Sequence, residues 1–324
     1  MLDRRRTIAS LALFAASLTA AGGALAQSGF PVKSLRIIPM GTGFPENTTR
    51  MLAAEIAEMT GQSVVVEAKP GANGILASEY VAKQPADGYT ILIGTNSTHA
   101  ANQSLYKKLP YDFINDFAPI SGVSQGLLLA AVNPARMSVR SIAELTTLAK
   151  KEPGKLTFGW GGSSPRAAAE LYKQIAGVKL VDVPYKTNPQ AISDLLGGQI
   201  DLIFADLAII SQHLKAGTLR PLAVTGVQRA SSFPDVPTMQ EAGVPGYDLT
   251  FWLAAYVPAG TPKDIVNRLN ELFVAALGRP KMVEYLTNVG SVPFPTTPDQ
   301  LMKFQQDESV KWKRIIEFAG MAPQ

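Results

Sequence analysis

The stretch LRIIPMGTGFPEN, residues 35–47, decides the fold class. Leu35–Pro39 is a short, largely unbroken apolar run, which is typical of a strand buried on both faces of a parallel sheet. A loop of small and hydroxyl-bearing residues, Met40–Asn47, follows it. Thr48–Met59 then has a helical pattern that ends at Gly61, where a left-handed cap is common. A strand, a loop and a helix in this order form the repeating unit of an α/β fold.

The same alternation continues along the chain. Further apolar runs predict strands at Val64–Glu67, Thr90–Gly94, Leu128–Val132, Leu156–Phe158, Val181–Pro184, Leu202–Phe204 and Leu222–Thr225. Helical patterns occur at Arg166–Ile175, Pro189–Leu196, Lys263–Leu277, Pro280–Asn288 and Pro298–Phe318. Gly177 and Gly197 are expected to cap two of these helices. The alternation implies right-handed crossovers and an α/β class with mostly parallel strands.

The N-terminus has the pattern of a cleaved secretory signal. Arg4, Arg5 and Arg6 precede an apolar run from Ile8 to Ala21, and Ala24-Leu25-Ala26 supplies the small residues of a cleavage site. The apolar run is shorter than the ~20 residues of a membrane span. We therefore expect residues 1–26 to be a signal peptide, exported by the general or the twin-arginine route, and the mature protein to be periplasmic.

Composition limits the function classes. About 300 mature residues usually form two domains. The chain has no Cys and only His99 and His213, which leaves little for thiolate, zinc or histidine-based chemistry. Removing residues 1–26 takes three Arg and one Asp from the 30 basic and 26 acidic residues, leaving 27 and 25. No basic run indicates nucleic-acid binding. We expect no enzyme, no metal and no cofactor.

Three loops after predicted strands are the candidate site, because open α/β sheets bind ligands at the carboxyl ends of their strands. The first loop is Met40–Asn47, the second is Thr95–Asn102 and the third is Gly159–Arg166. Each is rich in glycine or hydroxyls and precedes a predicted helix. Free backbone N–H groups at such helix starts favour an anion. Three such loops together predict an anion site rather than ordinary capping.

Catalytic motifs are incomplete. Gly41-Thr42-Gly43 lacks the third glycine of a dinucleotide fingerprint, and the serines of the third loop, Ser163 and Ser164, lie outside a G-x-S-x-G motif. His99 is interpreted as a hydrogen-bonded loop residue rather than a base for these serines. Trp160, between two glycines, is better placed to line a cleft than to fill a core. The sequence therefore favours a binding protein, with a secreted serine hydrolase as an alternative.

A set of short motifs then resembles a known family, the periplasmic solute receptors of tripartite tricarboxylate transporters, or Bug receptors. The motifs, which occur in the expected order over nearly the whole mature chain, are Lys69-Pro70-Gly71-Ala72-Asn73-Gly74, Pro85-Ala86-Asp87-Gly88-Tyr89-Thr90, Gly94-Thr95, Thr98-His99-Ala100, Leu105-Tyr106-Lys107-Lys108-Leu109-Pro110-Tyr111-Asp112, Asp182-Val183-Pro184-Tyr185-Lys186, Asp194-Leu195-Leu196-Gly197-Gly198-Gln199-Ile200-Asp201, Lys215-Ala216-Gly217, Pro234-Asp235-Val236-Pro237-Thr238 and Pro258-Ala259-Gly260-Thr261-Pro262.

The resemblance implies a two-lobed periplasmic-binding-protein (Venus flytrap) fold, in which each lobe is a mixed, mostly parallel sheet flanked by helices. Lobe 1 would hold residues 27–127 plus 251–324, and lobe 2 residues 128–250. The implied function is capture of a small carboxylate between the lobes and its delivery to membrane transporter subunits. We expect a monomer without nucleic-acid partners. A ligand-presenting partner of a two-component sensor stays open as an alternative, because sequence does not separate it from transport.

This chain departs from the family pattern at positions that bear on specificity. Phe44 adds an aromatic ring to a first loop that is one residue shorter than usual. Arg166 replaces a common His, and Ala205-Asp206 replaces Asp-Asn. A cation in the first turn of a helix opposes the helix dipole, so Arg166 is expected to meet a ligand carboxylate or Asp206, or to extend into solvent. The ligand is thus a small organic acid, with aromatic and amino-bearing acids both open.

The complete predicted site combines the three loops with these positions. Its ligand-binding residues are Met40, Thr42, Gly43, Phe44, Asn47, Thr95, Asn96, Thr98, His99, Trp160, Gly162, Ser163, Ser164, Arg166, Tyr185, Asp206 and Trp252.

Overall fold

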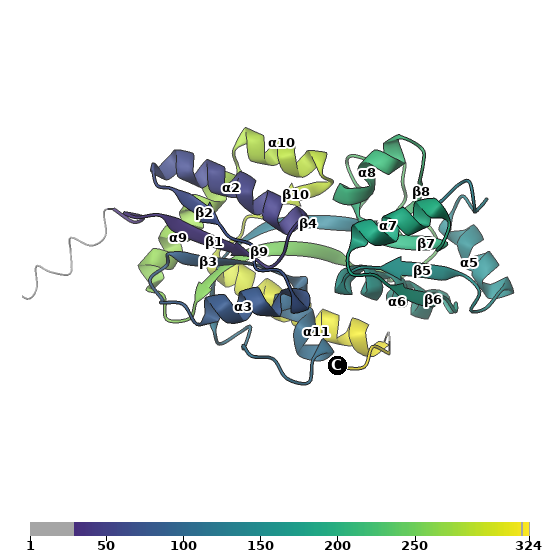
Figure 1. The fold of residues 1–324 in the computed structure, drawn as a ribbon, viewed down its shortest axis with the longest axis horizontal. Helices are drawn as coiled ribbons and strands as arrows, with labels where there is room; N and C mark the ends of the chain where they lie inside the picture. The colour runs from purple at the N-terminus through teal and green to yellow at the C-terminus, as the bar shows by residue number, and fades with distance from the viewer. Residues whose placement is uncertain (1–28, 319, 324) are drawn as a thin grey trace, which may run out of the picture.

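The computed structural model describes residues 29–318 and 320–323, so the predicted signal peptide lies outside the described residues. Two lobes lie side by side along the long axis of the molecule (Figure 1). Over the described ranges, no helix has the length and apolar character needed to cross a membrane.

The first lobe is built on a parallel sheet with the order β2-β1-β3. Its strands are β1 (Leu35–Pro39), β2 (Val64–Val66) and β3 (Thr90–Thr95). The helical segments around this sheet are α2 (Phe44–Thr60), η1 (Ala72–Gly74), α3 (Ile75–Ala82), η2 (Ser97–Ala101), α4 (Asn102–Leu105), α9 (Lys263–Leu277) and α10 (Pro280–Asn288). The carboxyl ends of β1 and β3 lead into the first and second loops.

The second lobe repeats this plan. Strand β5 is parallel to β6 and to β7, and β8 is joined to them through β4. The strands are β5 (Thr157–Trp160), β6 (Val181–Pro184), β7 (Leu202–Asp206) and β8 (Arg220–Val224). The helices are α5 (Ile142–Lys151), α6 (Ser163–Ala176), α7 (Asn188–Gly197) and α8 (Leu207–Lys215). The third loop follows β5 and ends in α6.

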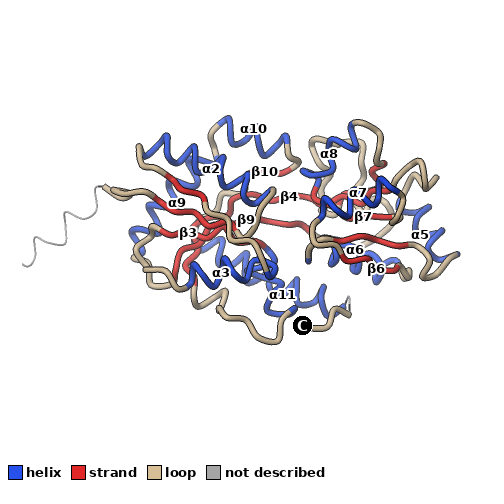
Figure 2. The backbone as a smooth tube through the Cα atoms, viewed as in Figure 1, coloured by secondary structure: helices blue, strands red, loops and turns tan. Residues whose placement is uncertain are grey.

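Two long strands, β4 (Phe117–Val132) and β9 (Thr250–Pro258), run between the lobes (Figure 2). Residues of β4 up to Leu127 pair with β9, whereas Leu128 to Val132 pair with β7 and β8. A short strand, β10 (Ser291–Pro293), pairs with β4 beside this change of partner. Because both long strands are antiparallel to their neighbours, they join two parallel half-sheets into one mixed sheet.

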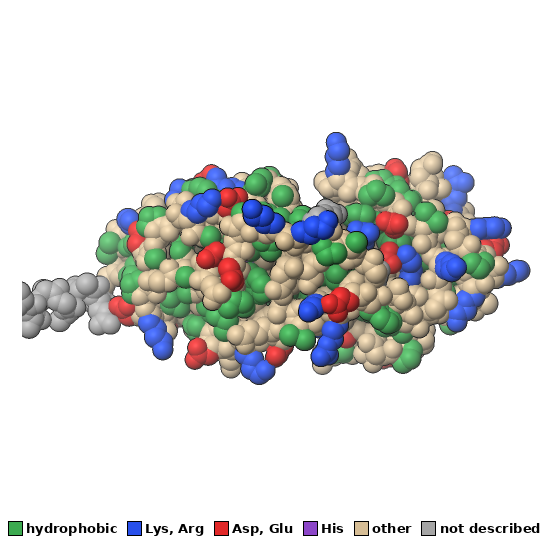
Figure 3. All heavy atoms as spheres, turned by 90° about the horizontal axis from the view of Figure 1, so that it is seen from below, with side chains coloured by type: hydrophobic (Ala, Val, Ile, Leu, Met, Phe, Trp, Pro, Cys, Tyr) green, Lys and Arg blue, Asp and Glu red, His purple; other side chains and the backbone are tan. Residues whose placement is uncertain are grey.

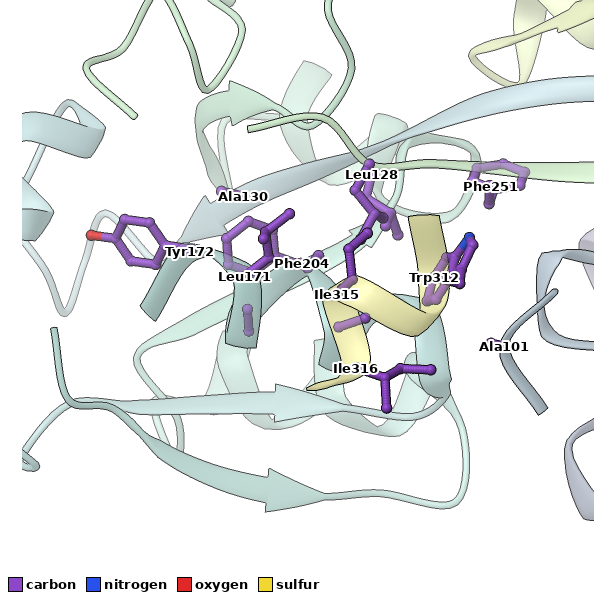
Figure 4. Close-up of a cluster of buried hydrophobic side chains, with 14 of the residues drawn as sticks. Ala101, Leu128, Ala130, Leu171, Tyr172, Phe204, Phe251, Trp312, Ile315 and Ile316 are labelled. Atoms are coloured by element: carbon purple, nitrogen blue, oxygen red, sulfur yellow. The ribbon is translucent and has the colours of Figure 1, made fainter. Parts of the chain in front are cut away.

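A continuous apolar core underlies the junction of the lobes. The C-terminal helix α11 (Pro298–Phe318) carries Trp312, Ile315 and Ile316, which lie beside side chains of α6, β4 and β7 (Figure 4). All three are buried, as are Phe204 and Tyr172. The last helix of the chain therefore packs against the second lobe as well as the first.

The structure confirms the predicted α/β class and the alternation of strands and helices. Strands β1 and β6 and helices α9, α10 and α11 have the predicted bounds. Four expectations were wrong. Helix α6 begins at Ser163 rather than Arg166, so half of the third loop is helical. Leu128–Val132 is only the end of a 16-residue strand. The cap of α7 is Gly198 with φ 76°, and Gly197 lies inside the helix. Helix α2 begins at Phe44 rather than Thr48, so half of the first loop is helical.

Candidate functional site

The second and third loops touch across the boundary between the lobes. The side-chain amide of Asn96 donates to Ser164 Oγ at 2.9 Å, and the hydroxyls of Ser97 and Ser163 lie 2.7 Å apart. These residues follow β3 of the first lobe and β5 of the second lobe. The carboxyl ends of the two parallel half-sheets therefore face each other, as expected for a ligand site in an open α/β fold.

The second loop satisfies most of its own polar groups. Thr98 Oγ1 accepts from the backbone N–H of Thr95 at 2.9 Å, and Thr95 Oγ1 accepts from the N–H of Ser97 at 3.1 Å. The following turn, η2, has the wide hydrogen bonding of a π-helix, a form often found at functional sites. The loop is buried throughout, so Thr95, Asn96 and Thr98 are held in a closely packed and internally hydrogen-bonded segment.

His99 belongs to the core of the first lobe. Its ring stacks on Tyr256 with centroids 3.9 Å apart, and Nδ1 lies 2.8 Å from Thr98 Oγ1. Burial lowers the pKa of His99 to about 3, so the ring is neutral at ordinary pH. Ser163 and Ser164 bond to Ser97 and Asn96 instead. Within the described chain no hydrogen bond links His99 to either serine, and the geometry gives the hydrolase alternative no nucleophile–base pair.

The third loop is held close to the start of α7. The N–H of Gly161 donates to Asn188 Oδ1 at 2.9 Å, and a Cβ at Gly161 would lie 2.2 Å from the carbonyl carbon of Thr187. Glycine is thus required here by a close backbone approach. Helix α6 starts at Ser163 with Gly162 as its N-cap, and among the described residues no side chain caps it. Its first N–H groups and the positive end of its dipole favour an anion.

Arg166, in the first turn of α6, is turned toward Trp160. Its guanidinium carbon lies 4.8 Å from the centroid of the Trp160 ring, and the indole Nε1 donates to Asp182 at 3.3 Å. The buried Nε of Arg166 has no hydrogen-bond acceptor in the described part of the chain. No ion pair joins the two described residues Arg166 and Asp206, so the predicted pairing between them is not formed.

A pocket of about 290 Å³ lies beside this arginine, between the lobes. The first lobe and the C-terminus contribute Asn73, Leu105, Tyr106 and Met321, and the second lobe contributes Trp160, Gly161, Gly162, Ser163, Arg166 and Tyr185. We call this the Arg166 pocket. Tyr185 is fixed there by a 2.7 Å hydrogen bond from its hydroxyl to Asp194.

The first loop occupies a different part of the boundary. Thr42, Gly43 and Asn47 are exposed, while Met40 is partly buried. Phe44 packs edge-on against Phe251 of β9, with ring centroids 5.3 Å apart. The added aromatic ring of this loop thus contacts a crossing strand. The first loop does not line the Arg166 pocket.

Asp206 and Trp252 lie in contrasting positions. Asp206 ends β7 and is the N-cap residue of α8, and burial raises the pKa of its carboxyl group to about 6. Trp252 has no exposed surface, packs edge-on against Phe304, and donates its Nε1 to Glu308 at 2.9 Å. The ligand contact expected for Trp252 is therefore not supported, because α11 covers this side chain.

Sequence reasoning missed several residues at the boundary. Ser97 lies in the predicted second loop, but the sequence did not show that its hydroxyl reaches Ser163 of the other lobe, because that contact depends on the π-helical turn η2. Asn73 has a left-handed φ of 53°, a conformation that Asn tolerates better than most residues. Tyr106 follows the end of α4, and Met321 lies near the C-terminus. No local sequence pattern identifies either residue as part of the pocket.

Comparison with known proteins agrees with this architecture. The profile of the tripartite tricarboxylate transporter family receptor matches residues 48–321. The chain belongs to this receptor family. A relative, Protein BugT from Bordetella pertussis, is 31% identical over 325 residues, covering 98% of this chain and 99% of that protein. The resemblance to the Bug receptors seen in the sequence is confirmed.

Solved structures of the family have the same fold. The R. palustris protein Rpa4515 with adipate has a TM-score of 0.85 and 34% identity, covering 91% of this chain and all of that one (100%). MatC from Rhodopseudomonas palustris with bound malate has a TM-score of 0.78 and 28% identity, covering 89% of this chain and 100% of that one. The two-lobed receptor fold is therefore shared with proteins that hold small dicarboxylates.

Proposed function

We propose that this protein is a periplasmic receptor that captures a small carboxylate between its lobes and delivers it to membrane transporter subunits. The observation that carries the proposal is the meeting of the second and third loops at the uncapped start of α6. Hydroxyls, amides and helix N–H groups converge there from both lobes, which is a suitable environment for a carboxylate. The relatives solved with adipate and malate support this ligand class.

The proposal also includes the division of the chain into two lobes. We place residues 27–127 and 251–324 in one lobe and residues 128–250 in the other, because β4 changes its pairing partners after Leu127. A closed form in which the second and third loops touch, as they do in this structure, would hold the ligand between these loops and Asp206, with the exposed first loop at the entrance. On the face shown in Figure 3, charged side chains are scattered over both lobes rather than gathered into one patch. Such a surface suits a monomeric solute receptor better than a nucleic-acid-binding protein.

Thermal unfolding in the presence of candidate acids tests this function. A ligand at about 100 times its dissociation constant stabilises the folded protein by about 2.7 kcal/mol, which raises the melting temperature measurably. Adipate, malate and other small mono- and dicarboxylates form the panel, and their uncharged methyl esters are the matched controls. We expect at least one acid to stabilise the protein and its ester to have no effect. A panel in which no acid acts, or in which esters act equally, contradicts a carboxylate receptor.

A further inference from the structure

The Arg166 pocket differs from the rest of the cleft because it contains a cation that the protein does not neutralise. Arg166 forms no ion pair within the described residues, and its Nε is buried without an acceptor. An arginine with an unsatisfied buried donor is destabilising unless a ligand supplies the acceptor. The guanidinium is also placed at the start of α6, where the helix dipole disfavours a cation. Both facts indicate that an anionic group fits beside Arg166.

The orientation of this arginine is fixed by an aromatic ring. Trp160 lies under the guanidinium at 4.8 Å and is itself anchored to Asp182 through its indole N–H. A guanidinium over an indole face is stabilised by the ring quadrupole. A guanidinium held beside an indole ring can still use its N–H groups to meet a carboxylate in a paired geometry. Ser163 adds a hydroxyl to the same pocket wall.

The remaining walls mix polar and apolar surface and include three aromatic side chains. Trp160 and Tyr185 come from the second lobe, and Leu105 and Tyr106 come from the first. Aromatic side chains favour offset or edge contacts with another ring. The volume of about 290 Å³ is at the small end of the roughly 300–1,000 Å³ typical of ligand pockets. The pocket therefore suits one ring and one carboxylate.

We propose that the Arg166 pocket binds the ring and carboxylate of a planar aromatic acid. This inference rests on the proposed function and makes the ligand class more specific. Arg166 supplies the charged contact, Trp160 and Tyr106 supply the ring contacts, and the site is complete only when the lobes are closed. The neutral donors of the second loop lie outside this pocket and do not determine the preference for a ring.

Calorimetric titration with benzoate, cyclohexanecarboxylate and adipate tests the inference. Benzoate and cyclohexanecarboxylate carry the same charge and the same number of ring atoms. A difference between their affinities therefore reports the effect of a planar aromatic ring. We expect benzoate to bind at least about tenfold more tightly than its saturated analogue, a ratio that corresponds to about 1.4 kcal/mol. Equal affinities for the two acids overturn the ring preference.

Two variants test the roles of Arg166 and Trp160 separately. Arg166→Gln should weaken benzoate binding by about tenfold or more, because a hydrogen bond to a charged group is lost. Trp160→Leu should reduce the preference for benzoate over cyclohexanecarboxylate. Arg314→Gln, at an exposed position of α11, is the matched control and should bind as the parent does. Melting of each empty variant reports whether it folds. Parent-like benzoate binding by a folded Arg166→Gln protein overturns the assignment.

The three acids also separate this inference from the proposed function. Binding of adipate without binding of benzoate overturns the aromatic site and leaves the carboxylate receptor intact. Binding of none of the three acids overturns the aromatic site, while the wider acid panel above decides the receptor function.

Discussion

The second and third loops are alike in sequence, since each follows a buried strand and carries small hydroxyl-bearing residues, yet they differ in structure. The second loop is buried, and its threonines bond to their own backbone. The third loop is half-exposed, starts an uncapped helix and presents Arg166. The second loop is therefore satisfied internally, whereas among the described residues the third loop leaves α6 without a side-chain cap and Arg166 Nε without an acceptor. We infer that changes in the second loop alter stability first, whereas changes in the third loop alter binding first.

The largest expected effect concerns His99 behind the second loop. Its folded pKa is about 3, against an ordinary value of 6.5, so the unfolded chain takes up a proton that the folded protein does not. Stability should therefore fall as pH decreases from about 6.5 toward 3, by up to about 5 kcal/mol from this group. Urea unfolding of the parent and of His99→Gln along this pH range measures the effect. Parallel pH profiles for the two proteins would contradict it.

Asp206, in the second lobe, should have the opposite pH dependence. Its folded pKa is raised to about 6 from 3.8, so the folded protein holds a proton that the unfolded chain has lost. This contribution is fully present below about pH 3.8 and is lost as pH rises through about 6. Asp206→Asn should therefore stabilise the empty protein above about pH 6, by up to about 3 kcal/mol. A variant no more stable than the parent at neutral pH would show that the carboxylate is solvated.

Thr98→Val sharpens the contrast between the loops. The change removes the hydroxyl that accepts from the buried N–H of Thr95 while nearly keeping the side-chain shape. Leaving this donor without a partner should cost about 1–3 kcal/mol of unfolding free energy. Thr42→Val, in the exposed part of the first loop, is the control and should stay within about 0.5 kcal/mol of the parent. Similar losses in both variants would remove the distinction between buried and exposed hydroxyls.

The smallest stability effect is expected in the third loop. Changing Ser163 and Ser164 together to Ala should weaken carboxylate binding by about 0.5–1.5 kcal/mol for each lost hydrogen bond. Melting of the empty protein should change less than in Thr98→Val, because both serines are partly exposed and Gly162 is the N-cap of α6, so the loss is confined to their hydrogen bonds with Ser97 and Asn96. Ser193→Ala, on the exposed face of α7, is the control. Calorimetry that finds parent-like affinity in the double variant would argue against a ligand contact.

The candidate site was predictable as a set of loops but not as a set of contacts. The positions of the second and third loops follow from the apolar runs that precede them, and both segments follow strands as predicted, although residues 97–102 and 163–166 are helical. Sequence did not show that Trp252 is covered by α11, because the covering residues Phe304 and Glu308 lie more than 50 positions away, as the separation of 56 between Trp252 and Glu308 shows. It also gave no signal for Tyr106 and Met321, which reach the Arg166 pocket only through the fold.

The sequence alone determined the strand–loop–helix units, because apolar runs and glycine caps are local features of the chain. It also determined the family, through motifs spread over most of the mature length. Only the tertiary structure decided that Phe117–Val132 is one strand shared by two lobes, since its two halves are specified by different partners, β9 and β7. Tertiary structure likewise decided that Arg166 lies over Trp160 rather than beside Asp206. The physical reason is that side-chain partners depend on distances across the fold, which no local pattern of residues contains.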